Sequence, residues 1–298
     1  MQTNRVFNDK KVLLSTHSLS FSYDKQTQLS NINLNCYAGE FIGLIGCNGA
    51  GKSTLLKLLL GLLPSAQGQV RINQQPLTHF KRREIAKQIA FVPQSIDLPF
   101  AFSVEEVVMM GRNPYLGAFQ LASAQDRKIV KKAMHTTDIS HLMARKVNQL
   151  SGGEKQRVII ARALAQQSLS ILLDEPIASL DISHQFETLD LIQSLTEKGK
   201  LAITAIHDLN LAAHYCSRLI LLGKNSRGEV SIVSNGSPKE VLNKQNLKTH
   251  FNIEADIIEV DIINETNIEY SNINPQHQRI QLTNIRAIKK IKAIKAIK

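Results

Sequence analysis

Residues 46–53 read Gly46-Cys47-Asn48-Gly49-Ala50-Gly51-Lys52-Ser53, and Thr54 follows them. This stretch matches G-x-x-x-x-G-K-[ST], in which glycines let backbone N–H groups turn inward around a phosphate. An apolar run at 41–45 precedes it and a Leu-rich run at 54–63 follows it, so the local order is strand, loop, helix. Lys52 would reach the outer phosphates, and the Ser53 hydroxyl would bind Mg²⁺. The stretch therefore predicts a site for a nucleoside triphosphate with Mg²⁺.

Two carboxylates end a second apolar run, Ile171-Leu172-Leu173-Asp174-Glu175. In open α/β sheets, ligands bind at the carboxyl ends of the strands, where these acids would lie. Asp174 would hold Mg²⁺, and Glu175 would orient or deprotonate the water that attacks the γ-phosphate. An apolar run before Asp-Glu is by itself usually a strand entering a solvated turn, but the phosphate loop upstream favours the catalytic interpretation.

A second phosphate-binding element lies about 100 residues after the first, at Leu150-Ser151-Gly152-Gly153-Glu154. Ser151 and Glu154 have the spacing of a capping box at the start of an apolar-periodic helix, and Gln156 and Arg157 follow. One phosphate loop cradles one nucleotide. A further contact must therefore bring residues 150–154 to the phosphate loop at residues 46–53.

Taken together, the motifs GCNGAGKS, LSGGEKQR, ILLDEP, ASLD and IHD resemble those of the ATPase subunit of ABC transporters, in the same order and spacing, over residues 12–250. The resemblance implies an α/β fold: a P-loop NTPase (RecA-like) core with an N-terminal antiparallel β-region and an inserted helical subdomain. It also implies binding of ATP and Mg²⁺ by a homodimer, in which Ser151 and Gly153 of one subunit cap the γ-phosphate on Lys52 of the other.

Further roles are carried over from the family by position. Tyr23 resembles the aromatic residue that stacks on adenine, Gln94 the glutamine that contacts Mg²⁺ and the attacking water, and His207 the histidine that contacts the γ-phosphate. Asp181 resembles the aspartate at the dimer contact. Each of these residues has an alternative interpretation without a role in binding. Tyr23 could be an aromatic residue at a strand end, Gln94 a polar residue after Pro93, and His207 a hydrogen-bonded histidine at a strand end. The predicted catalytic residues are thus Lys52, Gln94, Glu175 and His207. The predicted nucleotide-binding residues are Tyr23, residues 46–54, Ser151 and Gly153. The predicted metal ligands are Ser53, Gln94 and Asp174.

The chain divides into three parts by pattern. Residues 1–250 are predicted to form the ABC ATPase domain, with antiparallel strands over 12–37 and a helical subdomain at about 98–165. Ser237-Pro238 should start a helix running to about Thr249. Residues 251–285 form a C-terminal extension, with a strand at 253–263 and weak patterning afterwards. The basic tail, 286–298, is expected to be disordered.

Composition excludes several classes of protein. The 298 residues are 43% hydrophobic, which excludes disorder as the main state, and no apolar run is long enough to span a membrane. The net charge is +11, but six basic residues belong to the tail, and aromatic residues make up only 5%, which argues against nucleic acid as a partner. Three scattered cysteines predict reduced thiols, and the N-terminus does not resemble a signal peptide.

Without membrane spans, the chain would serve a separate integral membrane permease from the cytoplasmic face of the membrane and, indirectly, a substrate-binding protein. Residues 102–114 and 180–185 are similar to those of importers of ferric siderophores, haem and cobalamin. Residues 100–116 would dock the permease, although Phe100, Phe102 and Met109 could equally belong to the subdomain core. A ferric siderophore is the first choice of substrate; haem, cobalamin or another substrate is the alternative, and a soluble ABC ATPase without a permease is a distant one.

Overall fold

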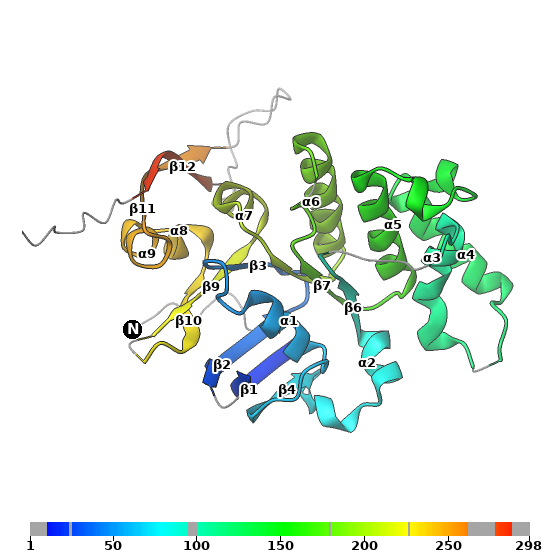
Figure 1. Ribbon diagram of the computed structural model, residues 1–298, viewed down its shortest axis with the longest axis horizontal. Coiled ribbons are helices and arrows are strands. Elements are labelled where there is room, and N and C mark those ends of the chain that lie inside the picture. Colours follow the sequence, from blue (N-terminus) through cyan, green and yellow to red (C-terminus); the bar gives the residue numbers. More distant parts are fainter. Residues whose placement is uncertain are drawn as a thin grey trace, which may run out of the picture.

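The computed structural model describes residues 11–23, 26–94, 100–117, 119–178, 180–225, 227–261 and 278–287. In this part of the chain, ten strands form one sheet in the order β5-β4-β1-β2-β10-β9-β3-β8-β7-β6. A separate two-stranded sheet, β11-β12, lies at one end of the molecule, and α3, α4 and α5 lie at the other (Figure 1). This arrangement confirms the predicted α/β fold with an inserted helical subdomain.

The elements of the molecule have these bounds. The strands are β1 (Val12–Tyr23), β2 (Gln26–Tyr37), β3 (Phe41–Ile45), β4 (Gln67–Ile72), β5 (Gln75–Pro76), β6 (Ile89–Val92), β7 (Ser170–Asp174), β8 (Leu201–Ala205), β9 (Arg218–Lys224), β10 (Val230–Gly236), β11 (Ile253–Asp261) and β12 (Gln278–Ala287). The α-helices are α1 (Lys52–Leu59), α2 (Arg82–Gln88), α3 (Val104–Met109), α4 (Ala124–Thr136), α5 (Gly152–Ala165), α6 (Ile182–Glu197), α7 (Leu209–Tyr215), α8 (Pro238–Val241) and α9 (Lys244–Asn246). The short helices are η1 (Leu77–His79), η2 (Met110–Tyr115), η3 (Ser140–Leu142), η4 (Val147–Gln149) and η5 (Leu247–Phe251).

The centre of the sheet is parallel. Strand β3 pairs in parallel with β8 and β9, β8 with β7, and β7 with β6. Strands β3, β7 and β8 are buried along their whole length, as near-continuous apolar strands covered on both faces should be. Parallel strands end at one edge of a sheet, so the residues after β3, β6, β7 and β8 are brought to the same place.

Alternate residues of the central strands enter two different hydrophobic cores. In β7, Ile171 and Leu173 join the core shared with the helical subdomain and α6, whereas Leu172 joins the core formed with α1 and the antiparallel strands. Strands β1 and β2 are antiparallel, as predicted for residues 12–37. The sheet is therefore a buried layer between two cores, and this burial fixes the positions of its strand ends.

The helical subdomain is held together by a buried ion pair. Arg112 Nε donates to Asp126 Oδ1 at 2.9 Å, and Arg112 Nη1 donates to the carbonyl of Ala165 at 2.8 Å. Ser123 caps α4, and its side-chain hydrogen bond, together with that from Arg112, lowers the pKa of Asp126 to about 2. A Cβ atom at Gly111 would lie 2.2 Å from the carbonyl oxygen of Arg162, so η2 approaches α5 closely.

The C-terminal region differs from the prediction in two places. Ser237 caps α8 with the expected capping box, but the helix ends at Val241 and the predicted single helix to Thr249 is wrong. The backbone leaves the helical region at Leu242, and the Asn243 side chain starts a new helix by accepting from the Asn246 N–H. The weakly patterned stretch contains β12, which runs to Ala287 and so includes the first two residues of the predicted tail. The rest of the tail lies outside the described residues.

Within the described ranges, no helix combines the length and the apolar character needed to cross a membrane.

Candidate functional site

The loop between β3 and α1 has the shape of a phosphate cradle. Gly49 and Gly51 both have φ of +77°, the left-handed region that favours glycine. A Cβ atom at Gly46 would lie 2.5 Å from the carbonyl oxygen of Leu222, so no side chain fits there. Cys47, Asn48 and Gly49 are exposed at the outside of the loop. The loop is therefore exposed to solvent at these three residues.

Lys52 begins α1 and points back into the loop. Its Nζ donates to the carbonyl oxygens of Gly46 at 2.8 Å and Cys47 at 3.4 Å. Burial lowers the pKa of Lys52, and the negative charges of Glu175 and Asp174 oppose that shift. The loop therefore holds a partly desolvated cation next to two carboxylates, where a phosphate would find a strong electrostatic partner.

Ser53 and Asp174 supply oxygen ligands suitable for Mg²⁺. Ser53 Oγ lies 2.8 Å from Oδ1 of the buried Asp174, which ends β7. Neighbouring ligands of an octahedral Mg²⁺ ion, each about 2.1 Å from the metal, lie about 3 Å apart. The two oxygens therefore fit adjacent positions on such an ion.

Glu175 lies between two other predicted site residues. Its Oε2 accepts from Gln94 Nε2 at 2.8 Å, and its Oε1 lies 2.5 Å from His207 Nε2. Glu175 has φ of +50°, an uncommon backbone conformation for a residue with a side chain. We call Ser53, Gln94, Asp174, Glu175 and His207 the strand-end cluster, because they follow the parallel strands or start the first helix.

The predicted second phosphate element starts α5 as expected. The Ser151 hydroxyl accepts from the Glu154 N–H at 3.3 Å, and Glu154 Oε2 accepts from the Ser151 N–H at 2.7 Å. Hydrogen bonds from the backbone and the side chain of Ser151 lower the pKa of the Glu154 carboxyl. We call residues 151–154 the signature turn; Ser151 and Gly152 are exposed in it.

The predicted site residues fall into two groups. Lys52 and the strand-end cluster lie together, whereas no hydrogen bond or ion pair among the described residues joins the signature turn to the phosphate loop. Ala50 is buried, and Thr54 is partly buried in the first turn of α1. Tyr23 ends β1, and its side chain lies outside the described residues. The predicted site residues thus form one cluster and one separate turn that begins a helix.

Two contacts at the site escaped sequence reasoning. His184, in the first turn of α6, lies 2.7 Å from Asp181 through Nδ1 and packs against Gly153. Cys47 Sγ donates to the carbonyl oxygen of His250 at 2.7 Å. The only signal for the first contact was the i, i+3 spacing from Asp181 to His184, and the second joins residues 203 positions apart, beyond any local pattern.

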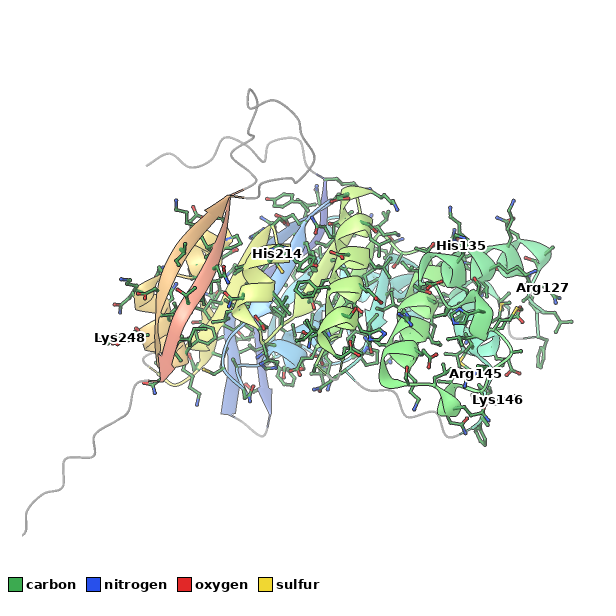
Figure 2. The ribbon with its side chains drawn as sticks, turned by 90° about the horizontal axis from the view of Figure 1, so that it is seen from above. Arg127, His135, Arg145, Lys146, His214 and Lys248 are labelled. Atoms are coloured by element: carbon green, nitrogen blue, oxygen red, sulfur yellow. The ribbon has the colours of Figure 1, made fainter. Side chains whose placement is uncertain are left out.

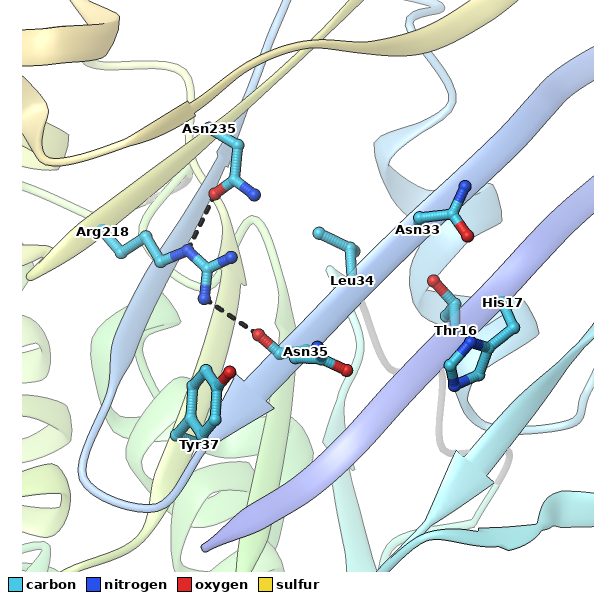
Figure 3. A pocket seen from close by; sticks show the side chains of 8 residues that line it. All are labelled: Thr16, His17, Asn33, Leu34, Asn35, Tyr37, Arg218 and Asn235. Carbon is cyan, nitrogen blue, oxygen red and sulfur yellow. Dashed lines mark hydrogen bonds between the residues drawn. The ribbon is translucent and has the colours of Figure 1, made fainter. Parts of the chain in front are cut away.

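A polar pocket lies elsewhere, on the antiparallel strands (Figure 3). Its cation, Arg218, already donates to Asn235 Oδ1 at 2.7 Å and to the Asn35 carbonyl at 2.9 Å, and it pairs with the buried Glu40. None of the predicted site residues lines this pocket, so it has no part in the site.

Comparisons with known proteins agree with this geometry. Residues 29–178 match the family model described as ABC transporter. The chain is 43% identical over 232 residues to the hemin import ATP-binding protein of Pseudomonas fluorescens strain Pf-5, covering 76% of this chain and 88% of that one. It is 38% identical over 247 residues to the ferric enterobactin transport ATP-binding protein of Escherichia coli K12, covering 83% and 89%.

A solved structure assigned to a metal-chelate type ABC transporter, in an inward-facing conformation, is similar with a TM-score of 0.74 at 27% identity, covering 91% of this chain and 97% of that one. The chain that carries these three features is thus similar to ATP-binding transport proteins in sequence and in fold. This chain belongs to the ABC transporter family and is an ATP-binding subunit whose ATPase activity is coupled to transport.

Proposed function

We propose that this chain hydrolyses ATP with Mg²⁺ in a homodimer and so powers the import of a metal chelate, a ferric siderophore as first choice, through a separate membrane permease. The contact of one carboxylate, Glu175, with both Gln94 and His207 beside the phosphate loop carries this proposal. That arrangement suits a general base with two groups that orient the attacking water and the γ-phosphate.

In the proposed reaction, backbone N–H groups of residues 46–51 and the Lys52 ammonium bind the β- and γ-phosphates. Ser53, Asp174 and the amide oxygen of Gln94 would hold Mg²⁺, which neutralises phosphate charge when bound. Glu175 accepts a proton from the water that attacks the γ-phosphorus, and the bond from that phosphorus to the β–γ bridging oxygen breaks. His207 hydrogen-bonds the γ-phosphate oxygens as the charge moves. Tyr23 would stack on the adenine.

The separation of the two groups of site residues supports a homodimer. The signature turn exposes the N-terminus of a helix of fourteen residues, α5, where backbone N–H groups favour an anion. Since nothing among the described residues of the same chain brings it to Lys52, Ser151 and Gly153 of a second copy would complete the site. Asp181, which caps α6, would lie at that contact. ATP binding closes the dimer, and hydrolysis reopens it.

The permease would dock on the helical subdomain. Phe100 is 69% exposed and stacks edge-on against Phe102 with ring centroids 5.9 Å apart, while Phe119 and Leu121 are exposed further along. Phe102 and Met109 instead pack against the core. Of the three residues that the sequence left open between docking and core, Phe100 is therefore the one proposed to contact the permease. Such exposed apolar side chains favour a protein partner. The chain would then lie peripherally at the cytoplasmic face of the membrane, act indirectly for a substrate-binding protein, and need no nucleic acid.

The substrate class rests on the relatives rather than on this chain, because the ATPase does not contact the transported molecule. The names of the relatives support haem or a ferric siderophore, and cobalamin remains the third choice from the sequence.

Uptake assays separate these choices. Cells that produce the wild-type chain, Glu175→Gln, or the control Glu197→Gln are given labelled ferric siderophore, haem or cobalamin; Glu197 is exposed at the end of α6. We expect Glu175→Gln to abolish siderophore uptake alone, and Glu197→Gln to change nothing. Loss of haem or cobalamin uptake alone would replace the siderophore as the substrate. Unchanged uptake of all three would overturn the metal-chelate proposal.

A further inference from the structure

The segment between Glu175 and α6 is held by side chains from the first turn of that helix. Gln185 Nε2 donates to the carbonyl oxygens of Ile177 at 3.3 Å and Leu180 at 3.1 Å. Asp181 Oδ1 accepts from the His184 N–H at 3.0 Å and so caps α6. Gln185 therefore holds the backbone that follows Glu175, and His184 holds the carboxylate of Asp181.

The imidazole of His184 lies between Asp181 and the signature turn. Its Nδ1 is 2.7 Å from Asp181 Oδ1, and because a carboxylate only accepts, Nδ1 must carry a proton. Hydrogen bonds from the His184 N–H and imidazole lower the pKa of Asp181. On its other side, the ring approaches Gly153 so closely that a Cβ atom there would lie 3.0 Å from Cδ2 and 3.1 Å from Cγ. One ring thus connects the starts of α5 and α6.

This contact depends on both residues and is not part of the buried core. The His184 side chain is 33% exposed and that of Asp181 is 68% exposed, so burial alone would not hold either of them in place. The approach is possible because residue 153 has no side chain. Glycine at this position thus permits both close access of an anion to the backbone and contact with the His184 ring.

We propose that His184 and Gln185 are positioning residues for ATP hydrolysis: they join Asp181 and the signature turn into one rigid surface that meets the partner subunit's nucleotide. This inference rests on the homodimer proposed above. Neither residue needs to touch the nucleotide. His184 sets the spacing between Asp181 and Gly153. Gln185 holds the backbone that follows Glu175 in a fixed position relative to these two residues.

The inference predicts a specific kinetic effect. Among the described residues, no hydrogen bond or ion pair joins His184 or Gln185 to Lys52 or the loop around it, the groups proposed to bind ATP within one subunit. Loss of His184 or Gln185 should therefore leave the KM for ATP nearly unchanged. The surface formed by Asp181 and the signature turn should be less well aligned with the nucleotide of the other subunit, and kcat should therefore fall. A residue that merely stabilises the fold would lower the melting temperature without separating kcat from KM.

The test uses the full chain and ATPase kinetics. We expect His184→Ala and Gln185→Ala each to lower kcat about tenfold, the effect of losing one hydrogen bond to a charged or oriented group, with KM changed less than about twofold. Nδ2 of an asparagine occupies the position of the histidine Nδ1, so His184→Asn should regain most of kcat. The control is His135→Ala on the exposed surface of α4, where Figure 2 shows His135 at the end of the molecule opposite to β11-β12. Wild-type kcat in His184→Ala, or no rescue by asparagine, would overturn the inference.

A second measurement separates this inference from the proposed homodimer. The Glu175→Gln variant is held at saturating ATP and its mass is followed by light scattering as the protein is diluted, alone and combined with His184→Ala. We expect Glu175→Gln to dimerise, and the double variant to need about tenfold more protein to do so. If Glu175→Gln stays monomeric at saturating ATP, the homodimer itself is wrong. If both dimerise at the same protein concentration, the homodimer stands and the role of His184 is refuted.

Discussion

The strand-end cluster and the signature turn are both proposed to bind phosphate but are built in different ways. The cluster lies where buried parallel strands end, and its side chains contact one another directly, as in the contact of Glu175 with His207. The signature turn begins a helix, is partly exposed, and is held by its own cap and by the ring of His184. The first is complete within one chain, whereas the second offers free N–H groups to a ligand that this chain does not bring to it.

This difference indicates how binding and hydrolysis can be separated. In the proposed homodimer, a cluster preassembled at the ends of buried strands binds ATP within one chain, while the signature turn approaches or withdraws with the other chain. Four predictions test this difference between the two regions.

The largest effect is expected for Glu175→Gln, which keeps the shape of the side chain but removes the base. Hydrolysis should fall by about 10² to 10⁴-fold, the usual contribution of general base catalysis, while ATP binding persists. The measurement is steady-state phosphate release together with equilibrium binding of a fluorescent ATP analogue, with Glu197→Gln as the control. Hydrolysis at the wild-type rate would contradict the assignment of the base to the strand-end cluster.

Next in size are Lys52→Ala and Ser151→Ala, which disable one region each. Lys52→Ala should weaken ATP binding about 10- to 100-fold through loss of charged hydrogen bonds, whereas Ser151→Ala should leave binding to the monomer intact and lower hydrolysis by a similar factor.

Mixing the two variants tests whether the regions work across subunits. In a mixed dimer, the intact phosphate loop of one chain faces the intact signature turn of the other, so equal amounts should recover about a quarter of wild-type activity. A mixture as inactive as its parts would mean that the two regions do not form a shared site.

A third prediction concerns thiols. Cys47 is exposed in the phosphate loop, whereas Cys36 and Cys216 are buried, and burial raises the pKa of Cys36 to about 12 and that of Cys216 still further. A maleimide should therefore label Cys47 alone in the native protein and inhibit hydrolysis. ATP at ten times its Kd should slow the labelling about tenfold, as measured by mass spectrometry. Cys47→Ser should resist inhibition, and undiminished activity after stoichiometric labelling would refute the prediction.

The smallest effect on activity is expected from Asp126→Asn, which acts on the frame of the signature turn. Since the pKa of Asp126 is about 2 in the folded protein and near 4 when unfolded, its stabilising effect is complete above pH 4 and disappears as the pH falls towards 2. The variant should lose about 1 to 3 kcal/mol of stability at pH 7 and show a shallower loss between pH 4 and pH 2, measured by urea unfolding. An unchanged pH dependence would show that the Arg112–Asp126 pair contributes nothing.

Much of the strand-end cluster could be predicted from the sequence because its signals are local. The glycines, Lys52 and Ser53 are contiguous, and the apolar run before Asp174 and Glu175 predicts a buried strand that ends in two acids. The early end of α8 could not be predicted as easily, because the capping box marks the start of a helix and not its length. Strand β12 was missed because it alternates only over residues 279–283, within an otherwise weakly patterned segment. Its place depends on pairing with β11 and on Asn210, which bonds both backbone groups of Leu282.

By itself the sequence determined the phosphate loop, the acids at the end of β7, the capped start of α5 and, through their order, the family. Tertiary structure alone decided that Gln94, Glu175 and His207 touch, that the His184 ring lies against Gly153, and that the signature turn does not meet the phosphate loop of its own chain. The reason is physical: caps, turns and buried strands depend on neighbours within a few residues, whereas contacts between strand ends and helix starts depend on how the whole sheet and its two cores pack.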